Sequence, residues 1–508
     1  MTLFMRQSID ERYYWNFNRG RTLMLKKIGR KTWGLPTEAV GDLGQKLHGV
    51  WERFRDCFRT KTRENSEYAY HYVSGLLRME TERNFTGIGR ESDVSGQNVQ
   101  HFMSQSPWSG ASVCEQVQRE VGAIPDLVKG GVLVIDESAD EKAGNKSAGA
   151  ARQYNGRQGK VEMSQVGVFL SYVNLTVLQG FWTWIAGKLF LPEAWFNDDH
   201  KAIRDRLGIP NTLKFKTKIE LAWDAVQEVM AQGLPFEIIA FDTFYGQSAK
   251  FRGQIRNAGA LYMAEVPVDT QVYLEPPTLG ILERTSKKGR APSRVQVLSG
   301  EPVRVDTLRV PSDWCRLRVR TTERGELNDR FIFRRVWTVH NDTVIEDWLI
   351  IREESDGRYS YALCNAPVDA PREQLAWWKC QRYFIERSNQ DAKSELGWDE
   401  LRAQKYLAWE HHLALTILAS WFVAQTKYEW AQAYPRDPEL MNQLGTDSLP
   451  ALSVANIREL LRSVMPLKQL TEEQAIERII EHLSNRVRSR RSRLKKQRLQ
   501  LRSQLAYG

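Results

Sequence analysis

The sequence predicts an α/β fold in which a mixed β-sheet is interrupted by a β-rich insertion and flanked by helical regions at both ends. Residues 131–242 contain apolar runs and one amphipathic segment in the order strand, strand, strand, helix, strand, which is typical of a mixed sheet. Residues 266–366 instead alternate apolar and polar side chains between short turns, as antiparallel strands do. A chain of 508 residues is too long for one hydrophobic core, so we expect several domains.

The composition is that of an ordinary globular protein. Hydrophobic residues make up 42% and charged residues 26%, which excludes wholesale disorder and a membrane-embedded body. The longest apolar stretch, residues 413–424, is shorter than the about 20 residues that cross a bilayer, and we interpret it as a buried helix. Charged residues from Arg6 to Arg12 interrupt any secretory signal, so we expect a cytoplasmic protein.

The cysteines and histidines give no sign of a metal or disulfide framework. The five cysteines include no C-x-x-C pair, which argues against a zinc ribbon and against paired disulfides. His411 and His412 are adjacent on an expected helix and point in different directions, so we assign them structural roles.

The N-terminal region, residues 1–124, is predicted to be helical and to bind DNA. Basic and aromatic residues are interleaved between residues 12 and 21. Within residues 67–80, the large side chains of Tyr68, Tyr72, Leu76 and Met79 recur at helical spacing. We favour a core-facing helix for this stretch, and a DNA-reading role for the segment as a whole.

The central part of the chain supplies the predicted sheet. Strands are expected at 131–136, 166–175, 180–191 and 236–242, and a helix at 218–232. We divide the remaining chain as follows: core, first part, 125–265; β-rich insertion, 266–368; returning core helix, 369–434; and helical C-terminal region with a basic tail, 435–508. A Pro-rich link at 434–438 and a capping box at 471–474 mark the last of these.

The charge is concentrated at the C-terminus. Of a net charge of +10, residues 486–508 contribute nine Lys or Arg and no acid. Such a block binds polyanions by releasing condensed counterions, so we expect nucleic acid as the partner. A solvated tail with no specific partner would have the same composition.

Three carboxylates are candidates for a shared metal site. Asp136 and Asp242 each end an apolar strand, where ligands gather in α/β sheets, although a strand-ending Asp is also a common turn or cap residue. At 100° per residue, a helix over 382–393 places Arg382, Glu386 and Lys393 on one face together with Asn389. That face suits either a metal ligand between phosphate-binding cations or a solvated salt-bridged stripe. Three such acids are enough to hold two divalent cations for phosphodiester hydrolysis.

These residues resemble the ribonuclease H-like DDE transposases of bacterial insertion sequences, in the branch whose third acid lies in a Y-R-E-K helix. Arg382, Glu386 and Lys393 match that signature in type and spacing, whereas Lys379 occupies the tyrosine position and Tyr383 lies one turn further along. The similarity extends over about residues 65–430. Further matching stretches are residues 134–138, 152–160, 164–168, 189–195 and 241–246.

The resemblance implies a ribonuclease H-like core in which Asp136, Asp242 and Glu386 bind two Mg²⁺ ions, with Mn²⁺ as a substitute. In related enzymes a tryptophan of the insertion holds a flipped base, for which Trp314, Trp337 and Trp348 are the candidates. The expected DNA contacts are Arg382, Lys393, Lys379, Tyr383, Asn389, Trp337, Arg490, Arg491, Lys495 and Lys496.

The resemblance therefore implies a DNA transposase that acts as a homodimer on double-stranded transposon ends and target DNA, in the cytoplasm at the nucleoid and without a membrane partner. Two alternatives keep the same residues. One is a structure-selective nuclease or resolvase, and the other is a catalytically inactive DNA-binding derivative.

Overall fold

The computed structural model describes residues 31–32, 35–156, 159–282, 293–322, 325–354, 356–434 and 452–468, with single residues between 442 and 495. The chain divides into two compact units, Met1–Met465 and Pro466–Gly508, and all elements named below belong to the first. The basic–aromatic stretch at 12–21, residues 435–438 of the Pro-rich link and most of the capping box at 471–474 lie outside the described residues.

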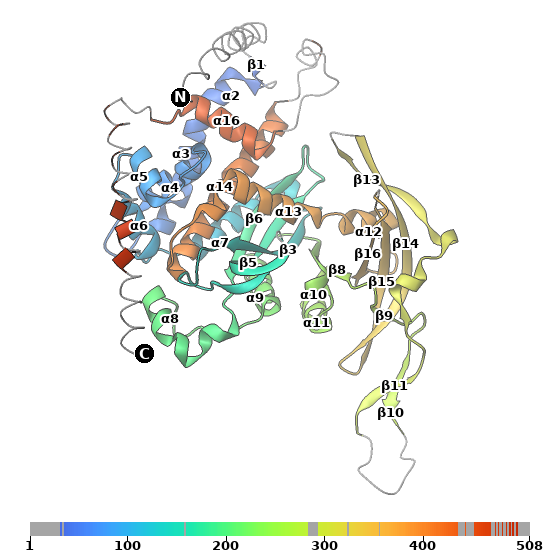
Figure 1. Cartoon of the computed structure of the whole chain (residues 1–508). Helices are drawn as coiled ribbons and strands as arrows, with labels where there is room; N and C mark the ends of the chain where they lie inside the picture. The colour runs from blue at the N-terminus through green and yellow to red at the C-terminus, as the bar shows by residue number, and fades with distance from the viewer. Residues whose placement is uncertain are drawn as a thin grey trace, which may run out of the picture. The chain divides into compact units, whose positions relative to one another are not determined.

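A ten-stranded mixed sheet forms the centre of the first unit (Figure 1). Strand β7 runs parallel to its neighbours β3 and β8, and the other pairs are antiparallel. In spatial order the strands are β13 (Cys315–Thr322), β14 (Gly325–His340), β15 (Thr343–Glu353), β16 (Tyr359–Cys364), β8 (Leu261–Val266), β7 (Ile238–Phe241), β3 (Val132–Glu141), β5 (Lys160–Asn174) and β4 (Ala151–Asn155), with β6 (Phe181–Leu189) also paired to β5. The predicted mixed α/β fold is confirmed.

The apolar runs become the central strands because both faces of the sheet are covered. Residues Val132 to Ile135 of β3 and Ile238 to Phe241 of β7 are all buried, as expected of parallel strands inside an α/β sheet. Helix α9 (Lys218–Ala231) packs on β5 and β6, and α13 (Tyr383–Gln390) packs on β3, β5 and β6.

The β-rich region between residues 266 and 366 is present, and most of it continues the central sheet. Four of its strands, β13 to β16, join the sheet where β16 pairs with β8. The other strands form two-stranded ribbons: β9 (Gln271–Val272) with β12 (Val303–Arg304), and β10 (Thr278–Ile281) with β11 (Val295–Ser299).

The N-terminal region is helical, as predicted, and the expected helix at 67–80 is α4, whose Tyr72 and Leu76 are fully buried. A short ribbon of β1 (Lys31–Thr32) and β2 (Leu35–Pro36) precedes the helices. The helices here are α2 (Thr37–Gly41), α3 (Leu43–Phe54), α4 (Ser66–Arg78), α5 (Phe85–Glu91), α6 (Gly96–Ser104) and α7 (Gly110–Gly122).

The remaining helices lie around and after the sheet strands. They are α8 (Lys201–Leu207), α10 (Thr243–Gly246), α11 (Ala249–Asn257), α12 (Arg372–Lys379), α14 (Tyr406–Ala433) and α16 (Val454–Val464). Single turns of 3₁₀-helix lie at η1 (Arg55–Phe58), η2 (Pro125–Leu127), η3 (Glu193–Phe196), η4 (Asp198–His200), η5 (Val305–Leu308), η6 (Pro311–Asp313) and η8 (Trp398–Glu400).

Helix α14 contains the long apolar stretch and packs against α4, α6, α7 and β6. Its burial on most sides explains why it is apolar nearly all round. Across the part of the chain that the structure covers, no helix combines the length and apolarity needed to cross a bilayer.

The histidine pair on α14 is structural, as predicted. The His411 ring nitrogens lie 3.0 Å from the carbonyl oxygens of Met103 and Trp108, and His412 lies between the Tyr72 hydroxyl and the Trp398 carbonyl. Burial lowers the pKa of His411 to about 4 and that of His412 to about 3, so both rings are neutral. All five cysteines are free thiols.

Candidate active site

Asp136 and Asp242 directly follow the parallel-paired residues of the adjacent strands β3 and β7. The parallel register of β3 and β7 ends at Ile135 opposite Phe241, and the two aspartates are the next residues. Neighbouring strands lie about 4.8 Å apart, so the chain positions just before the two aspartates are held at that spacing. The apolar run predicted that the strand ends at Asp136. The structure differs, because β3 stays paired with β5 as far as Glu141.

Each aspartate has a defined local role. One oxygen of Asp242 caps the short helix α10, accepting hydrogen bonds from the amides of Phe244 at 3.0 Å and Tyr245 at 3.3 Å. One oxygen of Asp136 accepts a hydrogen bond from the Glu137 amide at 2.8 Å. The interpretation of Asp242 as a cap residue is therefore correct, and capping engages a single carboxylate oxygen.

The positive charges near Asp136 and Asp242 do not fully compensate for the negative charge of the two carboxylates, because the pKa of each is raised. Burial, followed by the charge of Asp242, raises the pKa of Asp136 to about 8. Burial also raises the pKa of Asp242, and the nearby charge of Glu137 acts in the same direction. Ionising both aspartates is thus costly unless a cation is present.

The cation that the chain itself provides is Arg382. This residue precedes α13, and its guanidinium contacts Glu386 at 2.9 Å and Glu265 of β8 at 3.2 Å. Burial alone would lower the pKa of Arg382, but the charges of Glu265, Glu386, Asp136 and Asp242 raise it above its usual value. One guanidinium therefore interacts with four carboxylates, which come from β3, the start of α10, β8 and α13.

The donor chemistry of the aspartate pair fits a divalent metal ion. Carboxylate oxygens are the ligands that Mg²⁺ prefers, and two carboxylates with raised pKa values are electrostatically favourable for a cation. Glu386 is different, because its side chain is 51% exposed and pairs with Arg382. Among the described residues, no group of three His, Cys, Asp or Glu side chains is arranged to hold a metal ion.

Two of the predicted DNA-contacting lysines are engaged inside the protein. Lys379, at the signature tyrosine position, is fully buried and pairs with Glu265. Lys393 donates a hydrogen bond to the Ala139 carbonyl at 2.7 Å and pairs with Asp140 at 3.1 Å, both on β3. The structure thus places both ammonium groups where they hold α12 and the segment after α13 against the sheet.

The predicted helical face at 382–393 is interrupted. The α-helix ends at Gln390, and Asp391–Glu395 forms a π-helical turn, so the 100° rule does not extend to Lys393. Asn389 is buried and accepts a hydrogen bond from the Trp184 indole at 3.0 Å. Tyr383, by contrast, is 49% exposed.

A polar network holds the π-helical turn in place. Asp391 pairs with Arg387 at 3.1 Å and accepts a hydrogen bond from the Trp182 indole, while the buried Lys427 ammonium lies 3.7 Å from the centre of the Trp182 ring. Burial lowers the pKa of Lys427 to about 8, and the charge of Asp391 opposes this.

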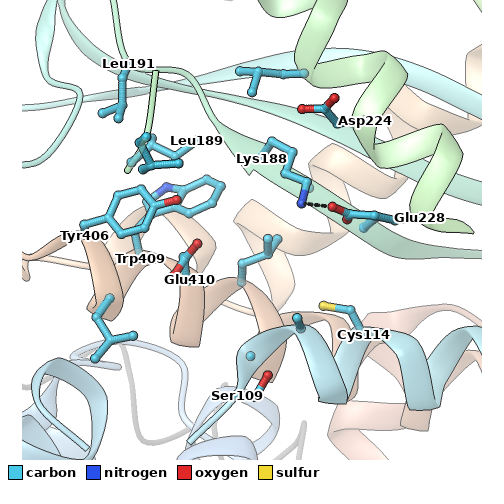
Figure 2. Close-up of a pocket in the computed structure, with 18 of the residues that line it drawn as sticks. Ser109, Cys114, Lys188, Leu189, Leu191, Asp224, Glu228, Tyr406, Trp409 and Glu410 are labelled. Atoms are coloured by element: carbon cyan, nitrogen blue, oxygen red, sulfur yellow. Dashed lines mark hydrogen bonds and ion pairs between the residues drawn. The ribbon is translucent and has the colours of Figure 1, made fainter. Parts of the chain in front are cut away.

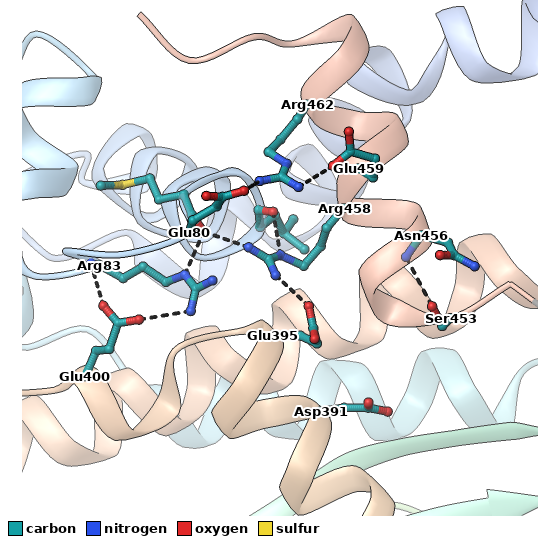
Figure 3. A network of polar contacts seen from close by, with 12 residues as sticks. Glu80, Arg83, Asp391, Glu395, Glu400, Ser453, Asn456, Arg458, Glu459 and Arg462 are labelled. Carbon is teal, nitrogen blue, oxygen red and sulfur yellow. Dashed lines mark hydrogen bonds and ion pairs between the residues drawn. The ribbon is translucent and has the colours of Figure 1, made fainter. Parts of the chain in front are cut away.

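The end of the same turn is tied to the N-terminal helices and to α16. Figure 3 shows Arg458 reaching Glu395, and the ion pair measures 2.6 Å. Arg458 also donates to the carbonyls of Leu77 and Met79 at the end of α4. The segment that follows Glu386 is therefore fixed by buried charges.

Sequence reasoning missed two further acids of this site. Glu137 lies on the opposite face of β3 from Asp136, where it pairs with Lys218 at 2.8 Å and accepts a hydrogen bond from Tyr245. Glu265 was also missed, although it pairs with Lys379 and Arg382, the two cations that come just before α13. Its position one residue before the end of β8 was the only available signal.

Gly246 explains how α10 fits against β8. A Cβ atom at this position would lie 1.7 Å from the Glu265 carbonyl oxygen, so only glycine allows this approach. The close contact fixes α10, and with it Asp242, against the strand that carries Glu265.

The insertion tryptophans lie at three different places. Trp337 is half-buried, and its backbone pairs with that of Tyr273. Trp314 lies under the Arg330 guanidinium at 5.0 Å, and Trp348 lies under Arg335 at 4.9 Å.

Of the predicted tail contacts, Arg490, Arg491 and Lys495 are exposed residues of the second unit, and Lys496 lies outside the described residues.

A separate cavity of about 720 Å³ lies between α7, β6, α9 and α14. Figure 2 shows Lys188 paired with Glu228, and this ion pair measures 2.6 Å. Tyr406 and Glu410, which also line the cavity, lie on the other side of the view. None of the predicted acids or DNA-contacting residues is among the residues that line it.

Comparison with known proteins assigns the family. The sequence profile described as "DDE superfamily endonuclease" matches residues 53–327, more than half of the chain, and this range includes Asp136 and Asp242 but ends before Glu386. The chain is also similar to a protein of Microchaete diplosiphon named "Probable transposase for insertion sequence element IS701". The two are 25% identical over 319 residues, which cover 61% of this chain and 69% of the relative. The mixed sheet, with its two aspartates at neighbouring parallel strands, is consistent with a ribonuclease H-like fold. The chain belongs to the DDE superfamily endonucleases.

Proposed function

We propose that the chain is a DNA transposase that binds the ends of its element, cleaves DNA by metal-dependent hydrolysis and joins the freed 3′-hydroxyl to target DNA. The observation that carries this proposal is the pair Asp136 and Asp242, whose raised pKa values mark a site that favours a cation. The similarity to a probable insertion-sequence transposase supports transposition over other DDE endonuclease activities.

Asp136 and Asp242, joined by Glu386, are the residues that would hold Mg²⁺, or Mn²⁺ as a substitute. A pair of such ions activates the attacking oxygen and stabilises the leaving oxygen of a phosphodiester. Glu386 is linked to the two aspartates by Arg382, because the charges of all three acids act on that guanidinium.

The flanking cations have separate proposed tasks. Arg382 orients the scissile strand by binding a phosphate, because its planar fork matches phosphate oxygens. Lys379, Lys393 and Asn389, which are engaged with protein groups, position α13 and the turn after it.

The remaining contacts bind DNA outside the cleavage site. Tyr383 and Trp337 are candidates for stacking on a displaced base. The tail residues Arg490, Arg491, Lys495 and Lys496 add affinity that does not depend on sequence. We propose that a homodimer pairs the two ends, and that the protein acts at the nucleoid.

The experiment that tests the proposal maps every product formed from the element's own ends. The protein is incubated with duplexes that carry both flanks of its coding gene, a supercoiled target and Mg²⁺. We expect cuts at the element ends and joined end–target products. Cleavage of branched DNA without end preference would instead indicate a structure-selective nuclease, and no cleavage of either DNA would overturn the proposal.

A further inference from the structure

Arg320 of the insertion lies against the helix that carries Glu386. It is near the end of β13, and its guanidinium carbon is 4.7 Å from the centre of the Tyr383 ring and 5.0 Å from that of Phe384. Both rings belong to the first turn of α13. An arginine stacked on aromatic rings keeps its N–H groups free to bind an anion in the plane of the guanidinium.

The charge of Arg320 is not neutralised in the way that the charges of neighbouring arginines are. In the described part of the chain, Arg320 makes no ion pair, and its Nε atom is buried without a hydrogen-bond partner. Seven other arginines of the insertion pair with carboxylates: Arg304 with Asp306, Arg318 with Glu326, Arg330 with Glu353, Arg334 with Asp313, Arg335 with Glu346, Arg352 with Asp329 and Arg358 with Asp356.

A buried donor without a partner is costly, because it loses its hydrogen bonds to water and gains none from the protein. An arginine that is stacked, half-buried and unpaired is therefore set up for a ligand that accepts hydrogen bonds and carries negative charge. The backbone phosphate of DNA meets both requirements.

The position of Arg320 relative to the proposed cleavage site identifies which phosphate it would contact. Tyr383 and Glu386 are three residues apart on α13, so they lie on the same side of the helix with Cβ atoms about 5–6 Å apart. Tyr383 is also half exposed, and Arg320 itself is only partly buried, so both side chains reach the protein surface.

We propose that Arg320 binds a backbone phosphate of the DNA strand that is cleaved, close to the scissile bond. This inference rests on the proposed function. Through Arg320 the insertion contacts the DNA held at α13, and the Tyr383 ring holds the Arg320 guanidinium in position by stacking on it.

The experiment compares Arg320→Gln with the matched control Arg330→Gln. Arg330 also stacks on an aromatic ring, that of Trp314, but it is paired with Glu353 at 2.7 Å. Binding of the coding gene's flanking duplex is measured by fluorescence anisotropy over a series of salt concentrations, and cleavage of the same duplex is followed in Mg²⁺. Melting temperatures are recorded for each variant.

For Arg320→Gln we expect roughly tenfold weaker binding at low salt and a slope of log K against log salt that is smaller by about 0.9, the value for one lost phosphate contact. Arg320→Lys, which retains the charge, should restore the slope but not the full cleavage rate, because lysine cannot stack in the same way. Arg330→Gln should leave slope and rate within about twofold of the wild type.

The outcomes separate the two proposals. If the wild type cleaves its ends and Arg320→Gln has the wild-type slope, the inference is overturned while the proposed function stands. A lower melting temperature with an unchanged slope would likewise reduce Arg320 to a packing residue. If the wild type neither binds nor cuts, both proposals fall together. If Arg320→Gln does not fold, the slopes of log K against log salt are measured instead for Arg320→Lys and Tyr383→Leu. A loss of slope in Tyr383→Leu alone supports the stacked phosphate site, and wild-type slopes in both overturn it.

Discussion

Replacing Asp136 with asparagine should stabilise the protein in the absence of metal. The pKa of Asp136 is raised from its ordinary 3.8 to about 8, chiefly by burial and then by Asp242. The folded carboxyl group thus holds its proton more tightly than the unfolded one, and stability falls as the pH rises from about 4 to about 8. At about pH 7.5 the cost of ionisation reaches up to about 5 kcal/mol, at about 1.36 kcal/mol for each pH unit.

The substitution would remove that cost but would leave the new side-chain amide to be satisfied, which takes back about 1–3 kcal/mol. We therefore expect Asp136→Asn to gain about 2–4 kcal/mol in EDTA near pH 7.5, and the gain to fall toward zero near pH 5.5, where the wild-type cost is about half as large. The assay is denaturant unfolding at both pH values, with and without Mg²⁺. Mg²⁺ should stabilise the wild type more than the variant.

The matched control is Glu346→Gln, which changes a half-exposed acid paired with Arg335 in the insertion and should stay within about 0.5 kcal/mol of the wild type. If Asp136→Asn were no more stable than the wild type in EDTA near pH 7.5, the carboxylate would not be strained, and the electrostatic argument for a cation site would fail.

Three further perturbations probe the framework of the site. Burial lowers the pKa of Lys427 from 10.5 to about 8, so between these pH values the folded protein binds fewer protons than the unfolded chain. The free energy of unfolding of the wild type, measured in urea, should therefore rise across this window by up to about 3 kcal/mol relative to that of Lys427→Met. Parallel curves of stability against pH for the two proteins would contradict this. Arg458→Met should cost about 3–5 kcal/mol, because it leaves Glu395 and two carbonyl groups without their partner, and an unfolding midpoint equal to that of the wild type would refute this. Gly246→Ala should abolish cleavage or folding, because its methyl group would overlap the Glu265 carbonyl oxygen, and circular dichroism with a cleavage assay would reveal an unaffected variant.

The fold of the central region could be predicted because its signals are local. Continuous runs such as residues 131–136 are apolar because both faces of a central strand are buried. The insertion instead alternates apolar and polar residues, because its strands have one more buried and one more exposed face. What the sequence did not indicate is that the insertion continues the central sheet. That result depends on the pairing of β16 with β8, whose residues lie about 100 positions apart in the chain, and no local pattern reports such an edge contact.

The site was predictable to the extent that the ends of apolar runs define it. Asp136 and Asp242 follow directly from two apolar runs, and the parallel register brings them side by side. The helical-face argument held for Arg382 and Glu386, which form an ion pair one turn apart. It failed for Lys393, because the π-helical turn after Gln390 changes the angle per residue.

The burial of Lys379 was equally out of reach of sequence reasoning. Its environment is set by Glu265, a carboxylate from a distant strand. A charged residue is expected to be exposed unless its buried partner is known, and long-range ion pairs leave no trace in local spacing.

The claim that the three acids form a single cleavage centre is tested most directly by single-turnover cleavage of the element's end duplex in Mg²⁺. Asp136→Asn, Asp242→Asn and Glu386→Gln are compared with Glu346→Gln. We expect each of the first three to lose about 10³-fold or more in rate while binding the duplex as the wild type does, and the fourth to cleave normally. A normal cleavage rate in Glu386→Gln, with the other two inactive, would show that the acid on α13 works apart from the aspartate pair and would contradict the account.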